Sequence, residues 1–71
     1  MEYSFTDFPR ISTSQSIALG KPHIAGTRIT VAALLAYLAG GMTEKQILKE
    51  FPKLDHEDIK QALSFASAMI K

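Results

Sequence analysis

The chain has 71 residues, 46% of them hydrophobic and 21% charged, a globular composition that excludes a disordered tail. Its formal net charge of +1 lacks the large basic excess of a dedicated nucleic-acid binder. Because cysteine is absent, disulfides and thiolate metal sites are excluded, and a second subunit or partner protein is the expected source of extra stability. No signal segment opens the chain, and its longest apolar run, 31–41, is about half a membrane span, so we expect a cytoplasmic protein.

Residues 1–29 are predicted to form an extended arm with short strands. Tyr3 and Phe5 alternate with polar residues, and Phe8-Pro9 is expected to end that strand. Farther along, β-branched residues flank the segment 25–27, which predicts either a short hairpin or a pair of tight turns. An isolated two-stranded pair is marginal in water, so this arm must pack on the helices or on a strand of another chain.

Residues 30–71 are predicted to form three helices joined by short turns. Gly40-Gly41 ends the first helix and Pro52 the second, and Gln46 completes a capping box at the start of the second. The predicted N-caps are Thr30, Thr43 and Asp55. We therefore expect one domain, 1–71, with a mainly α fold. It is a three-helix helix-turn-helix unit preceded by short N-terminal β-strands or a hairpin.

Two polar faces of this unit are candidates for DNA contact. The lysines of the second helix and its following turn suit phosphate contacts, and the outer stripe of the third helix, which ends at Lys71, suits a recognition helix. Both faces are equally consistent with ordinary solvated surface, and the acidic start of the third helix would repel phosphate. The candidate DNA-binding residues are Lys45, Lys49, Lys53, Lys60, Gln61 and Ser64.

The third helix also carries a second apolar row, Phe65 and Met69, beside its inner stripe. This row predicts either a protein interface or, at Phe65, a cover for the N-terminal strands. Both alternatives hold if the strands exchange between subunits.

No catalytic or metal-binding constellation is recognisable. The acidic run 55–58 is explained by capping and by compensation of the helix dipole, and His23 and His56 have no second ligand at metal spacing. We expect no cofactor, no metal and no enzymatic activity.

The segment 21–31 is the most distinctive in the chain. Gly26 is expected to adopt a positive φ, and Thr27 to close the turn through the backbone. Arg28 stands just before a helix N-terminus, where a cation opposes the helix dipole. It should therefore have a carboxylate partner, either in this chain as a clamp or in another protein.

Lys21-Pro22, Gly26-Thr27-Arg28-Ile29 and the later segments 40–43 and 51–54 resemble the small bacterial and archaeal family called domain of unknown function 433. The resemblance runs from about Arg10 to Ile70, with Leu19 where a second glycine often precedes Gly20. It implies a homeodomain-like or winged-helix-like fold.

The resemblance further implies an antitoxin of a type II pair, with a small toxin resembling PIN-type ribonucleases. In that role Arg28 or Arg10 would enter the metal-binding carboxylate cluster of the toxin. Arg10, Arg28, Phe65 and Met69 are thus the candidate partner-binding residues, in a homodimer or higher oligomer that also binds operator DNA. The alternatives are a stand-alone transcription regulator and an interaction module that no longer binds DNA.

Overall fold

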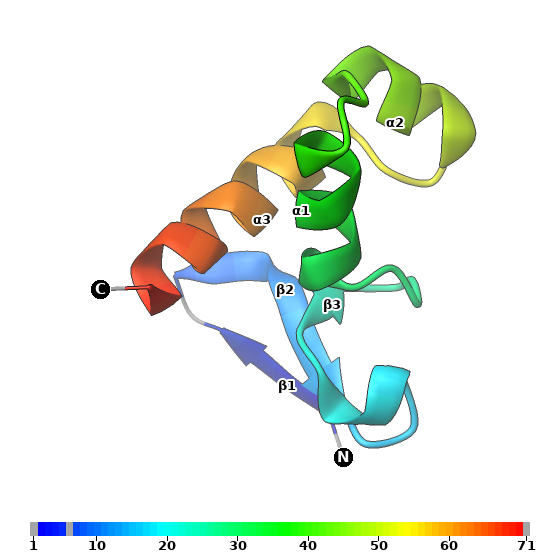
Figure 1. Cartoon of the computed structure of the whole chain (residues 1–71). Helices are drawn as coiled ribbons and strands as arrows, with labels where there is room; N and C mark the ends of the chain where they lie inside the picture. Colours follow the sequence, from blue (N-terminus) through cyan, green and yellow to red (C-terminus); the bar gives the residue numbers. More distant parts are fainter. Residues whose placement is uncertain (1, 6, 71) are drawn as a thin grey trace.

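Three helices pack on a small antiparallel sheet formed by the first third of the chain (Figure 1). The computed structural model describes residues 2–5 and 7–70, the first of these segments by its backbone. The strands are β1 (Glu2–Phe5), β2 (Phe8–Ser14) and β3 (His23–Ile24), and a short 3-10 turn, η1 (Ala18–Gly20), precedes β3. The helices are α1 (Val31–Ala39), α2 (Glu44–Glu50) and α3 (His56–Met69). The predicted fold class, a small helical domain preceded by strands, is therefore confirmed.

The sheet has the order β1-β2-β3, and β1 pairs with β2 of the same chain. The expectation that Phe8-Pro9 ends a strand is wrong, because β2 begins there. The register with β1 shifts between Ser4 and Phe5, and Pro9 falls in the part of β2 opposite that shift. There the ladder is interrupted, so the missing N–H of proline costs little.

All three predicted helix starts are confirmed, because each N-cap side chain accepts a backbone hydrogen bond. The Thr30 hydroxyl accepts from the Ala33 N–H, and Thr43 and Gln46 form the predicted capping box. Asp55 and Asp58 form a second box at the start of α3, which the sequence analysis did not identify. These caps satisfy backbone donors that have no partner within a helix.

The core lies between α1, α3 and the face of β2 turned toward them. Phe65 of α3 is only 4% exposed, and its ring meets the ring of Phe8 edge-on at a centroid distance of 5.4 Å. Of the two alternatives for Phe65, the structure shows the one in which it covers the strands. The other buried apolar residues are Ile11, Ile24, Val31, Leu34, Ile47, Leu54, Ile59 and Ala62.

The η1 turn contains two consecutive non-glycine residues with positive φ, Ala18 at 51° and Leu19 at 58°. This conformation costs a non-glycine residue roughly 1–2 kcal/mol, and glycine adopts it without that strain. Leu19 also points into solvent, 92% exposed. The departure of this chain from the family pattern thus falls on a strained, exposed position.

Candidate functional site

Arg10 links the sheet to the start of α3. Its guanidinium pairs with the carboxylate of Asp55 and, at 3.1 Å, with that of Asp58. Because the β1 ladder is interrupted here, the Arg10 N–H is free to donate to the Gln61 side-chain oxygen at 3.0 Å. The Arg10 carbonyl accepts from the Ala25 N–H at 2.8 Å. Arg10 therefore acts as an internal clamp, with its charge engaged inside the chain.

The clamp shifts the pKa of Asp55 and that of Arg10. Hydrogen bonds from Arg10, followed by a backbone hydrogen bond from Asp58, lower the pKa of the Asp55 carboxyl. The hydrogen bonds to Asp55 and Asp58 raise the pKa of Arg10. The acidic start of α3, which the sequence analysis took as repelling phosphate, thus carries a compensating cation.

The predicted DNA-binding residues separate into engaged and free side chains. Gln61 is engaged at both ends, because its oxygen accepts from Arg10 and its nitrogen donates to Glu57 at 3.1 Å. The others, all exposed, are Lys45, Lys49, Lys53, Lys60 and Ser64. No ion pair joins any of these lysines to another described residue, and Lys71, the end of the polar stripe, lies outside the described residues.

Arg28 stands on a tight turn between β3 and α1. Gly26 has a φ of 81°, and the Thr27 hydroxyl donates to the Ile24 carbonyl at 2.9 Å while accepting from the Ile29 N–H. Both turn predictions are therefore confirmed. The Arg28 side chain is exposed, and no carboxylate of the described chain pairs with it. The internal clamp that the sequence analysis considered for Arg28 is made by Arg10 instead.

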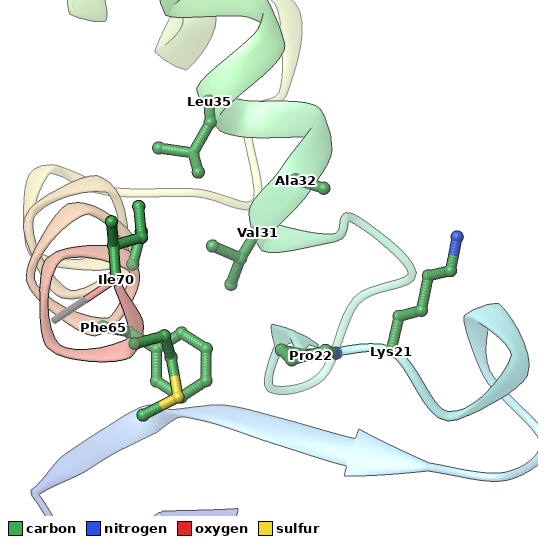
Figure 2. Close-up of a pocket in the computed structure, with 9 residues that line it drawn as sticks. Lys21, Pro22, Val31, Ala32, Leu35, Phe65 and Ile70 are labelled. Carbon is green, nitrogen blue, oxygen red and sulfur yellow. The ribbon is translucent and has the colours of Figure 1, made fainter.

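A groove of about 270 Å³ opens between α1, α3 and the segment leading into β3 (Figure 2). Phe65 approaches it from α3 and Ile70 from the position just after that helix, Val31 and Leu35 approach it from α1, and Pro22 lies below. Its lining is apolar, with Lys21 at one edge as the only charged residue among those that line it. The full lining is Lys21, Pro22, Val31, Ala32, Leu35, Phe65, Ala66, Met69 and Ile70.

Two large apolar side chains beside the groove are exposed to solvent. Met69 is 62% exposed and Ile70 is 77% exposed, both at the C-terminal end of α3. α1 (Val31–Ala39), which forms the opposite wall, has no charged residue, although part of its surface faces solvent. A helix that is apolar on all sides is normally covered on all sides. That property of α1 was the sequence signal for the groove, and it was not recognised.

The two histidines of the chain have structural contacts. His23 and Ser12 are buried together, with 3.3 Å between His23 Nε2 and Ser12 Oγ, so solvent does not reach this pair. His56 Nδ1 lies 2.7 Å from a Glu44 carboxylate oxygen and links α2 to α3. Among the described residues, no three His, Cys, Asp or Glu side chains gather as a metal site would require. No helix in the described part of the chain has the length and apolarity needed to cross a membrane.

Comparison with known proteins decides the family. Residues 11–66 match the family described as protein of unknown function (DUF433). The chain belongs to the DUF433 family. A crystal structure of a DUF433 member from Anabaena variabilis ATCC 29413 is similar to it, with a TM-score of 0.80 and 30% identity. That similarity covers 83% of this chain and 58% of the Anabaena chain.

The DUF433 chain is also similar to the uncharacterized protein y4eO of Sinorhizobium fredii (strain NBRC 101917 / NGR234). The two are 34% identical over 58 residues, which is 82% of this chain and 26% of y4eO. This chain therefore spans only part of the length of either relative.

Proposed function

We propose that this DUF433 protein is a cytoplasmic antitoxin, a binding protein rather than an enzyme, that holds a small nuclease-type toxin in the α1–α3 groove. The observation that carries the proposal is the groove itself, whose apolar lining continues onto the exposed Met69 and Ile70. Covering these side chains removes apolar surface from water, which is the main driving force of protein association.

The shape of the groove favours one inserted element of the partner. A volume of about 270 Å³ suits a few apolar side chains from one face of a helix, the helix-in-groove mode of recognition. Lys21 at the edge supplies one positive charge, so an acidic residue at the matching end of that helix would add a charged contact.

The proposal is tested with the product of the adjacent gene, because the family resemblance implies that toxin and antitoxin are encoded side by side. Expression of the neighbour alone should arrest bacterial growth, and co-expression of this protein should restore growth. The two chains should then co-purify in stoichiometric amounts through a tag on either one. A harmless neighbour, or a tagged chain that purifies alone, would contradict the proposal.

A second candidate function, DNA binding by a dimer, is supported by the distribution of charge. Among described acidic residues, Asp55 and Asp58 pair with Arg10, and Glu44 pairs with His56. The lysines of α2 make no such pairs with the described chain. Because the clamp holds one cation and two carboxylates, the rest of the chain carries a net charge of +2, and two copies would double it. Steep weakening of duplex binding with rising salt is the test.

A further inference from the structure

A second surface depression, of about 410 Å³, brings together two cations from distant parts of the sequence. Arg28 comes from the turn between β3 and α1, and Lys53 comes from the turn between α2 and α3. Both turns project from the right-hand side of the molecule in Figure 1. The remaining lining residues, Ile17, Gly26, Thr27 and Ile29, include no carboxylate.

The turn that carries Arg28 is held by several hydrogen bonds. The Ile24 N–H donates to the Ile29 carbonyl at 2.9 Å across the turn. The Thr27 N–H and hydroxyl both donate to the Ile24 carbonyl, at 3.0 and 2.9 Å. The backbone at Arg28 is therefore fixed before any ligand arrives, which reduces the entropy lost on binding.

The turn that carries Lys53 is fixed in a similar way. The Leu54 N–H donates to the Phe51 carbonyl at 2.9 Å, and the Leu54 side chain is buried in the core. Lys53 itself is exposed. Two short turns, each closed by backbone hydrogen bonds, thus present one cation each to the same depression.

The charges in this depression are not balanced by the described part of the chain. No ion pair joins Arg28 or Lys53 to another described residue. Asp55, only two positions beyond Lys53, is engaged by Arg10. Two cations that line one depression without an ion pair in the described chain attract an anion.

We propose that Arg28 and Lys53 form a single site for one backbone phosphate of duplex DNA. The guanidinium fork suits two phosphate oxygens at once, and the ammonium adds a point charge. Lys45 and Lys49 stand one helical turn apart on α2, the helix that leads into the Lys53 turn, between Glu44, which pairs with His56, and Glu50. Further cations leading to the site favour an extended polyanion over the compact carboxylate cluster of a partner protein. This inference rests on the second candidate function, DNA binding.

The test measures binding of a mixed-sequence 20-base-pair duplex over a range of salt concentrations. Arg28→Ala and Lys53→Ala should each weaken binding about tenfold at low salt. Each should also reduce the slope of log affinity against log salt by about one. The matched control is Lys21→Ala, which removes one exposed cation outside the depression. Arg28→Lys should recover part of the loss.

The double variant Arg28→Ala/Lys53→Ala separates a shared site from a general charge effect. Its loss should be smaller than the product of the two single losses, because both side chains act on one phosphate. If the wild type binds and the Arg28 and Lys53 variants lose no more than Lys21→Ala, DNA binding stands and the site is overturned. If the wild type does not bind the duplex, DNA binding and the site both fail, and weakened partner capture by Arg28→Ala would assign Arg28 to the toxin instead.

Discussion

The two ends of α3 differ in how fully the rest of the chain contacts them. At the N-terminal end, Asp55 and Asp58 cap the backbone and receive the Arg10 guanidinium. At the C-terminal end, Met69 and Ile70 leave large apolar side chains in water beside a groove. Contacts within this chain satisfy the charged groups at the N-terminal end. The C-terminal end has the exposed apolar surface that is typical of a protein interface.

This difference indicates where stability and function reside. The clamp at the N-terminal end fixes α3 on β2 and so positions both walls of the groove. Phe65 lies between the two ends, covering Phe8 on one side and lining the groove on the other. Changes near the clamp should therefore affect folding, and changes near Met69 should affect binding.

The largest expected effect on stability is at Phe65. Phe65→Ala removes a buried ring and its contact with Phe8, which should lower the free energy of unfolding by about 3–5 kcal/mol. Urea unfolding followed by circular dichroism measures this loss. Leu63→Ala, on the same helix but 44% exposed, is the control and should cost much less. Equal losses would contradict the assignment of Phe65 to the core.

The next effect is at the capping box of α3. Asp58→Ala removes the acceptor of the Asp55 N–H together with one of the two carboxylates that Arg10 contacts, and it should cost about 1–2 kcal/mol of unfolding free energy. Asp55→Asn is the informative comparison, because asparagine is a good N-cap but cannot form the ion pair with Arg10. It should lose less stability than Asp58→Ala. The reverse order would mean that the Asp55–Arg10 ion pair contributes more to stability than the cap and the Arg10 contact of Asp58 together.

A smaller effect is expected from acid. The folded-state pKa of Asp55 lies below its unfolded-state value of about 3.9. Its contribution to stability is therefore present above that value and is lost as pH falls through the lowered folded-state pKa. Thermal unfolding between pH 7 and pH 2.5 measures the loss, and Asp55→Asn should show a shallower decline below about pH 4. Identical pH curves for the two proteins would show that Asp55 does not contribute to the acid dependence of stability.

The smallest effect on stability is expected at the groove. Met69→Gln replaces an exposed side chain by a polar one of similar size, and the free energy of unfolding should change by less than about 0.5 kcal/mol. The urea curves of wild type and variant should nearly coincide. A large loss would show that Met69 stabilises the fold of the single chain, which would contradict its assignment to a binding surface.

Local signals predicted the helices well, because capping and helical spacing act within a few residues. Thr30, Thr43 and Asp55 were all identified from their immediate neighbours. β2 was misjudged because its proline lies opposite a register shift, which depends on where β1 pairs. Strand pairing of that kind is not visible in a local pattern.

The candidate site was less predictable, because it depends on contacts between distant residues. Arg10 finds Asp55 and Asp58 more than forty positions away, and no spacing rule points to that pairing. Arg10 pairs with these two carboxylates, and Arg28 is exposed and has no ion pair in the described chain. Met69 was identified from helical spacing, whereas Ile70, which is also exposed, was not among the candidate partner-binding residues.

Calorimetric titration of the co-purified partner against a pair of variants tests the central claim most directly. Met69→Gln places a polar amide in the apolar groove, and Leu63→Gln makes the same change on α3 outside it. We predict that Met69→Gln weakens binding roughly tenfold or more, because a buried amide without a partner costs about 1–3 kcal/mol. Leu63→Gln should bind like the wild type. Equal affinity for both variants would contradict the claim that the α1–α3 groove holds the partner.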